Sequence, residues 1–324
     1  MKFLKRKPKM DEILKLEKLR KSIIAKYKIY RILAAFSGGI LSFQCILPIF
    51  FDSRKGIAFM YFLAFIGVFY IFYSVTFKNL KEKGSKEFRD KYKNMYIAPY
   101  VKKLGFKYDV WGFVNATDII TSRIFPSFSF QNGNDKISGD IDGVHFEFSD
   151  LILQDESTRN GENDEIFNWM LGRSDGYDYH VKDTLFKGIF FVADFFKRIN
   201  SHTLVVSNPS SAGTEGLNKI NMDNTEFNRE FFVFSDDLQN AMYILSPSLM
   251  EKILLLKKQM KSDIAISFIG TKIFIRVDRE YDSFEPDVDK KVITNNLDKT
   301  IKKDLNAFLD IVKILGLNTK IWIA

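Results

Sequence analysis

The chain has 324 residues, and 46% of them are hydrophobic, which is sufficient to build one or two folded domains. Its formal net charge of +8 is unevenly distributed: residues 1–93 carry 21 basic against 7 acidic side chains, a net +14, and residues 94–324 carry 27 against 33, a net −6. Because the larger part is mildly acidic, these numbers exclude nucleic acid as an expected partner.

Two long stretches without charge predict a transmembrane helical hairpin. Ile32–Phe51 is twenty residues long and Ile57–Phe77 is twenty-one. At about 1.5 Å per residue each helix would measure roughly 30 Å, the thickness of the hydrocarbon core of a bilayer. Core helices, the alternative, have apolar runs of about 10 to 14 residues. The single cysteine, Cys45, lies in the first span, which excludes an intramolecular disulfide and a cysteine nucleophile outside the membrane.

The charges around the two spans predict the topology. Only residues 52–56 join the spans, so both outer ends lie on the same side of the membrane. Residues 1–31 hold twelve basic and three acidic side chains, residues 78–93 hold seven and three, and the turn holds two and one. The positive-inside rule therefore places both termini in the cytoplasm, with the chain anchored in the inner membrane. The basic flanks predict contact with the bilayer and with its anionic lipid headgroups.

The basic N-terminal segment, residues 1–31, contains an amphipathic pattern. Between Met10 and Tyr30, apolar residues recur at steps of three and four with Lys and Arg between them: Ile13, Leu16, Leu19, Ile23 and Tyr27. Two structures fit this pattern. One is a helix that lies on the lipid surface, and the other is a solvated or coiled-coil helix that continues into the first span.

After the hairpin, residues 32–77, a basic juxtamembrane helix is predicted over residues 78–104, and residues 105–324 are expected to form a cytoplasmic domain. The pattern ISGDIDGVHFEF, residues 137–148, predicts a β-hairpin with its turn at Asp142-Gly143. IAISFIGTKIFIRV, residues 264–277, predicts a second hairpin with its turn at Gly270-Thr271. Between them GIFFVADFF, residues 188–196, is apolar on both faces and predicts a central strand, followed by a further strand in HTLVV.

Helix signals return late in the chain. Ser235 or Asp236 is expected to cap a helix over DDLQNAMYIL, Ser246-Pro247 to begin one that ends at Met260, and a last helix is expected over residues 295–315. Residues 154–183 are polar and acidic and predict an exposed insertion that contains a short helix. The fold class is therefore α+β: a transmembrane helical hairpin followed by a mostly antiparallel β-sheet domain with several helices.

Five segments carry a resemblance to a known family: FPSFSF, DKISGDIDGVHFEFSD, FKGIFFVADFFKR, FFVFSDDLQNAMYILSPSLMEKI and ISFIGTKIFIRV. Together they resemble the bacterial domain-of-unknown-function family numbered 3137, and the string around GIFFVADF is the most specific. The resemblance implies two N-terminal transmembrane helices before a cytoplasmic domain. It implies no activity and no catalytic residue.

The candidate metal ligands lie on the first hairpin: Asp140, Asp142, His145 and Glu147. Carboxylates and an imidazole are side chains that bind a divalent metal, but the wet face of a half-buried hairpin explains the same residues. Asp194 is a second candidate, because burial within its strand would raise its pKa, although an ion pair or a turn at the strand end is the simpler interpretation. His180 and His202 are interpreted as surface residues.

Nucleotide-binding and hydrolase motifs are absent from the sequence, and no catalytic residue or cofactor is predicted. The polar insertion contains an exposed-looking apolar cluster, Ile166, Phe167, Trp169 and Met170, of the composition found where proteins dock. The sequence therefore favours a membrane-anchored cytoplasmic interaction or scaffold domain with an unidentified protein partner. The alternative is a membrane-bound enzyme with an acidic or metal site at the first hairpin or at Asp194.

Overall fold

The computed structural model describes residues 10–51, 66–67, 70, 84–160, 178–280, 283–286, 288–289, 291–292 and 297–317. The chain divides into two compact units: an N-terminal unit, residues 1–97 and 285–298, and a sheet unit, residues 98–284 and 299–324. Residues 285–298 thus belong to the N-terminal unit, although the sequence analysis places them within the 105–324 domain.

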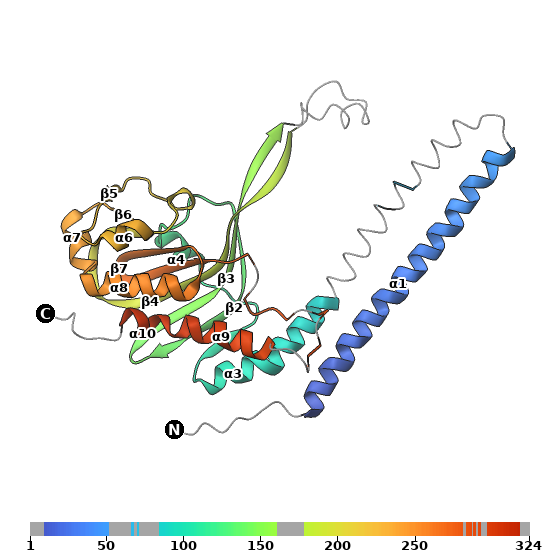
Figure 1. Cartoon of the computed structure of the whole chain (residues 1–324), viewed down its shortest axis with the longest axis horizontal. Helices are drawn as coiled ribbons and strands as arrows, with labels where there is room; N and C mark the ends of the chain where they lie inside the picture. The colour runs from blue at the N-terminus through green and yellow to red at the C-terminus, as the bar shows by residue number, and fades with distance from the viewer. Residues whose placement is uncertain are drawn as a thin grey trace. The chain divides into compact units, whose positions relative to one another are not determined.

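In the N-terminal unit, α1 is one continuous helix, Met10–Phe51, of 42 residues (Figure 1). The predicted apolar stripe exists: Leu16 and Ile23 are buried within this unit. The helix runs without interruption into the first predicted span, as the second alternative for the amphipathic segment expects. Residues 84–92 are helical and lead into the π-helical turn η1, Lys93–Ile97.

The buried stripe of α1 also contains an ion pair. Arg20 donates from Nη2 to Glu17 Oε1 at 2.7 Å and from Nε to Oε2 at 3.0 Å. Arg20 also donates to the carbonyl oxygen of Val288 at 3.3 Å, and the backbone N–H of Val292 donates to Glu17 at 3.1 Å. These bonds hold Val288 and Val292 against α1. The hydrogen bond from Arg20 is the main cause that lowers the pKa of Glu17.

Among the described residues, no helix combines the length and the apolarity of a membrane span. Of the second predicted span, Ile57–Phe77, only residues 66, 67 and 70 are described, and the turn at residues 52–56 lies outside the described residues. Most side chains of the first span, Ile32–Phe51, lie outside them too.

The sheet unit is built on antiparallel pairing, which confirms the predicted α+β class with a mostly antiparallel sheet. Its described strand elements are β1 (Lys107–Asp109), β2 (Phe130–Ile141), β3 (Val144–Asn160), β4 (Asp178–Val206), β5 (Asn218–Ile220), β6 (Phe232–Ser235) and β7 (Ile264–Asp278). The element β4 pairs with β3, β6 and β7, so the predicted central position of GIFFVADFF is confirmed.

The first predicted hairpin is confirmed by β2 and β3. Ile141 pairs with Val144, and the two turn residues Asp142 and Gly143 have φ of 51° and 87°. Positive φ at both positions is the type I′ geometry that matches the twist of the flanking strands, and Asp-Gly tolerates it. Phe146 and Phe148 are fully buried and His145 is exposed, as the alternation predicts.

The second predicted hairpin is confirmed within β7. The backbone N–H of Asp278 donates to the carbonyl oxygen of Asp263 at 3.0 Å, although an extended strand of this length would separate them by about 50 Å. The element therefore folds back on itself, at Gly270, whose φ is 62°. Because its two ends lie side by side, the parts of β4 that pair with it, residues 188–194 and 203–206, flank the β7 hairpin on its two sides.

The ends of the predicted insertion, residues 154–183, differ from the expected loop. The β3–β4 ladder continues from Gln154, opposite Thr184, to Asn160, opposite Asp178. The strand β2 pairs with β3 only as far as Gln154. Beyond that residue β3 and β4 pair only with each other and extend from the sheet as a two-stranded arm (Figure 1). This position suits the polar residues of the segment. Residues 161–177, with the predicted cluster Ile166, Phe167, Trp169 and Met170, lie outside the described residues.

The helices begin largely where the sequence places them. Ser246 accepts a hydrogen bond from Leu249 N and caps α8, Pro247–Met260. The helix α7, Leu238–Ile244, is capped by Asp237 and not by Ser235 or Asp236, because Ser235 ends β6 and accepts from Asp237 N. The last predicted helix is divided into α9, Leu297–Leu309, and α10, Ile311–Leu315. The other helices of the unit are α3 (Ala98–Lys103), α4 (Ala116–Thr121), the 3-10 turn η3 (Pro209–Ser211) and α6 (Thr225–Glu230).

Both faces of the sheet are covered. On one face, α8 and α9 lie across the strands (Figure 1). There the ring of Phe308 of α9 packs against that of Phe148 of β3, with 5.6 Å between the ring centres. The opposite face carries an apolar cluster in which Ile119 of α4 covers residues such as Phe190 and Phe274. This two-sided burial explains the abundance of phenylalanine in the strands.

Candidate functional site

The structure brings together only part of the predicted hairpin site. Asp140 lies opposite His145, and His145 Nδ1 is 3.1 Å from Asp140 Oδ1, with both side chains largely exposed. Glu147 instead forms an ion pair of 2.7 Å with Lys136 of β2. Asp142 occupies the turn. Across the described residues, no three His, Cys, Asp or Glu side chains gather in a way that holds a metal ion.

Of the two interpretations of Asp194, the less favoured one, a buried carboxylate, is wrong. Its side chain is exposed, and it lies opposite Lys272 of β7 in the strand register. Lys272 reaches Asp118 of α4 at 2.6 Å. This position at the end of the paired segment is the strand-end environment that the simpler interpretation describes.

The interpretation of His202 as a surface residue is also wrong, because its side chain is only 2% exposed. Its Nε2 lies 3.0 Å from Ser267 Oγ, and its backbone N–H donates to Asp236 Oδ1 at 2.9 Å. Burial lowers the pKa of His202 to about 4, with Arg123 acting in the same direction. A serine beside a histidine resembles a nucleophile with its base, but Ser267 is fully buried, so no substrate reaches it in this structure. His180 lies in β4, and its side chain is outside the described ones.

A cavity lies elsewhere, at the end of the sheet where the two ends of β7 meet. It has a volume of about 1250 Å³. The end of α8 and the turn after it form one wall, and α9 forms another. The lining side chains with ionisable groups are Lys187, Lys261, Asp263, Asp278, Arg279, Glu280, Lys302, Lys303, Asp304 and Asp310. We call this cavity the charged groove.

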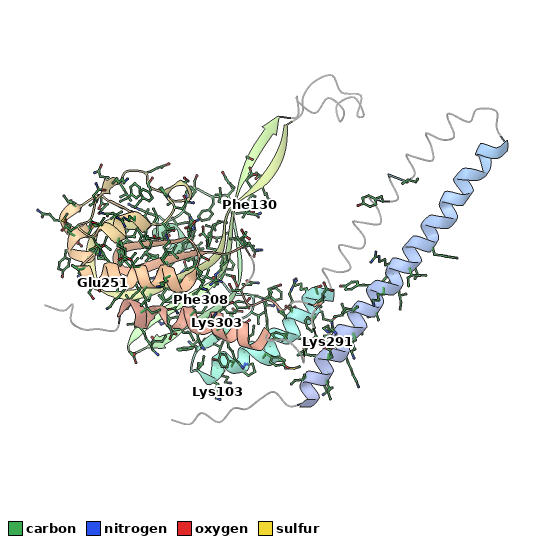
Figure 2. All side chains as sticks on the ribbon, in the orientation of Figure 1. Lys103, Phe130, Glu251, Lys291, Lys303 and Phe308 are labelled. Atoms are coloured by element: carbon green, nitrogen blue, oxygen red, sulfur yellow. The ribbon has the colours of Figure 1, made fainter. Side chains whose placement is uncertain are left out.

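Five positive and five negative side chains line the charged groove. Several are held by neighbours: Asp278 accepts two hydrogen bonds from Arg276, at 2.6 and 2.7 Å, and Asp263 accepts one from Ser207 at 2.8 Å. The guanidinium of Arg279 lies 5.5 Å from the centre of the Phe308 ring. Figure 2 labels Phe308 and Lys303 on α9. The groove has equal numbers of both charges. It is therefore more complementary to a partner surface that carries both signs of charge than to a simple anion.

Asp304 is the most perturbed acid of the charged groove. Burial raises its pKa, while Arg279 and Lys303 act in the opposite direction. Its Oδ2 atom is buried and has no hydrogen-bond partner among the described residues. Such an atom is costly to bury, so it marks a point at which a ligand donor would be favourable.

A second hollow of about 820 Å³ shares Lys261, Ser262 and Asp263 with the charged groove. It lies between α6 and α8, with Leu254 and Leu255 in its lining. Lys257 crosses it to form a 2.7 Å ion pair with Glu230. Neither hollow follows from a sequence motif, because the contributing residues come from separate segments that only the fold brings together.

Comparison with known proteins supports the resemblance to the family. Residues 184–317 match the family described as "Protein of unknown function (DUF3137)", a region that extends from β4 to α10. No curated protein matches the chain. The crystal structure of the mycobacterial trehalose monomycolate transport factor A, TtfA, is similar at 8% identity with a TM-score of 0.33, covering 67% of this chain and 92% of that one. A TM-score of this size is too low to assign a shared fold.

Proposed function

We propose that this chain is a membrane-anchored interaction domain. In this proposal residues 32–51 and 57–77 form a transmembrane hairpin, both termini are cytoplasmic, and the sheet unit offers its charged groove to a protein partner. The observation that carries the proposal is the change in exposure along α1.

As far as Tyr27, the residues on one side of α1 are protected. After it the described side chains are exposed on every side of the helix, including Ile29 at 56%, Ile32 at 67%, Leu33 at 56% and Phe36 at 69%. Water is an unfavourable environment for so many neighbouring large apolar side chains, at about 25 cal/mol per Å² of apolar surface. A helix that is apolar all round belongs in a protein core or in lipid. The change occurs within one helical turn of Arg31, the last basic residue before the uncharged stretch.

The charge distribution supports the orientation. Nineteen basic side chains flank the outer ends of the two spans and two lie in the turn between them. Moving the flanks across the membrane would violate the positive-inside rule. The proposed location is therefore the inner membrane, with the sheet unit in the cytoplasm.

An interaction role fits the groove better than catalysis does. Its mixed charges and half-buried Asp304 resemble a surface for recognition, and Ser267 is closed to solvent. The enzyme alternative at Asp140, Asp142, His145 and Glu147 gains no support from geometry, since Glu147 is engaged with Lys136. Phe167, Trp169 and Met170 remain a proposed second docking element.

Extraction at alkaline pH tests the anchor. We expect the full chain to remain in the membrane pellet, and the variant Ile32→Lys/Leu33→Lys to be released or degraded. The matched control is Leu238→Lys/Leu255→Lys, which places the same charges at exposed leucines of the sheet unit, 52% and 53% exposed. Release of the unmodified chain into the alkaline supernatant would refute the anchor.

Site-specific photo-crosslinking in native membranes tests the groove. A crosslinker in place of Lys303, which lines the charged groove, is expected to capture a discrete protein. A crosslinker in place of Lys103, in the last turn of α3 and outside the groove lining, is the control (Figure 2). Identical products from the two positions would contradict a specific role for the groove.

A further inference from the structure

The polar residues of α1 are sorted by side. Glu17, an acid in the middle of the basic segment, is buried and forms an ion pair with Arg20. The exposed side chains between residues 13 and 31 are almost all basic or neutral: Leu14, Lys15, Lys18, Lys21, Ser22, Ala25, Lys26, Lys28, Ile29, Tyr30 and Arg31. The outer surface of α1 between residues 13 and 31 is therefore cationic.

These basic residues lie at different distances from Ile32 along the helix axis. Because α1 is continuous, each residue adds about 1.5 Å along the axis. Measured from Ile32, Arg31 lies at about 1.5 Å, Lys28 at about 6 Å and Lys26 at about 9 Å. On the same scale Lys21 lies at about 16 Å, Lys18 at about 21 Å and Lys15 at about 25 Å.

The headgroup layer extends only about 5 to 7 Å beyond the hydrocarbon. Salt screens charges over about 8 Å at physiological ionic strength. A helix that enters the membrane at Ile32 therefore brings Arg31, Lys28 and Lys26 close to the headgroups. Lys15 and Lys18 lie farther from the headgroups than the screening distance. An average tilt of about 20° shortens these heights by less than a tenth.

A second helical segment of the N-terminal unit lies beside α1 at Tyr27. A Cβ at Gly84 would lie 2.6 Å from the hydroxyl oxygen of Tyr27, so the two segments touch there. Three basic residues, Lys78, Lys81 and Lys83, precede Gly84 in the sequence. Tyr30, 49% exposed, is of the type that is enriched at membrane interfaces.

We propose that Lys26, Lys28 and Arg31 form a contact ring for the phosphate groups of anionic lipids, and that Lys15, Lys18 and Lys21 take no part in it. This inference rests on the proposed membrane hairpin and specifies its lipid partner. It replaces the helix lying on the lipid surface, for which all six residues would contact lipid.

The test uses the full chain in vesicles of phosphatidylcholine that contain spin-labelled phosphatidylglycerol or spin-labelled phosphatidylcholine. The preference of the protein for the anionic lipid is the ratio of the two association constants. We expect the unmodified chain to prefer phosphatidylglycerol. In Lys26→Gln/Lys28→Gln/Arg31→Gln the preference should fall by about fivefold or more, because one basic residue near an anionic leaflet contributes that factor.

Lys15→Gln/Lys18→Gln/Lys21→Gln removes the same charge and should keep the preference of the unmodified chain. Equal losses in the two triple variants would overturn the ring and favour a helix on the lipid surface. An equal preference in all three proteins would also overturn it. Binding of inorganic phosphate to the detergent-solubilised chain, lost in the first triple variant alone, would assign the ring to free phosphate and reject the lipid.

Failure of this inference is distinct from failure of the anchor. Alkaline extraction of the same three proteins reports on the hairpin alone. If the unmodified chain stays in the pellet without preferring phosphatidylglycerol, the membrane anchor is supported and the lipid contact ring is refuted.

Discussion

The two units of this protein differ in how completely they bury their large apolar side chains. In the N-terminal unit an ion pair, Glu17 with Arg20, occupies the buried side of α1, while Ile32, Leu33 and Phe36 are exposed. In the sheet unit phenylalanines fill both faces of the sheet, and most charged side chains lie outside or along the charged groove. The sheet unit has the distribution expected in water, and the N-terminal unit has one that a lipid environment would explain.

The largest effect is expected in the sheet core. Phe148 is fully buried, with the ring of Phe191 at 6.1 Å and that of Phe308 at 5.6 Å. Phe148→Ala should lower the free energy of unfolding of the sheet unit by about 4 kcal/mol, through lost burial and the cavity left behind. Pulse proteolysis of the detergent-solubilised chain in urea measures it. Phe36→Ala, at an exposed phenylalanine of α1, should leave that value unchanged, and a comparable loss would break the contrast between the units.

The second effect is expected in the N-terminal unit. Glu17→Ala leaves Arg20 buried without its carboxylate and should cost about 3 kcal/mol of local stability. Replacing the pair by Glu17→Leu/Arg20→Met should restore most of it, since apolar residues often substitute for a buried ion pair without loss. Amide hydrogen exchange over residues 84–97 of the full chain reports the change. If the double variant is as destabilised as the single one, the pair is more than a local contact.

A pH effect is expected from His202. Its pKa falls from 6.5 to about 4 on folding, so between these values the unfolded chain binds more protons and stability declines as the pH falls. The loss at pH 5 should be about 2 kcal/mol relative to pH 7.5. Asp304, with a raised pKa, contributes with the opposite sign. Urea unfolding of His202→Gln, which removes the titrating imidazole and keeps a polar side chain, should show a smaller pH dependence. An unchanged pH dependence would assign the effect to other groups.

The smallest effect concerns a helix cap. Ser246→Ala removes the hydroxyl that accepts from Leu249 N at the start of α8 and should cost about 1 kcal/mol. Ser248→Ala, two residues later and at an exposed position, is the matched control and should be nearly neutral. The same urea measurement compares them, and an equal cost for both would mean that the cap does not anchor the helix.

Local chemistry determined much of this protein from the sequence. Asp142-Gly143 and Gly270-Thr271 specify turns because few residues tolerate positive φ, and Ser246-Pro247 specifies a helix start because it satisfies free N–H groups. Alternation identified Phe146 and Phe148 as buried, and the apolar run 188–196 as the central strand. Each of these signals acts over a few residues, so it survives without knowledge of the fold.

Only the tertiary structure decided the rest. His202 resembles a surface residue in sequence, but pairing of β4 with β6 and β7 encloses it, and Asp194 in an apolar run is exposed because it lies at the end of a ladder. The charged groove exists because the two ends of β7 meet beside α9, which joins residues 187, 263, 279 and 304 from distant segments. Periodicity records which residues are apolar, whereas burial and neighbourhood depend on long-range pairing that no local pattern encodes.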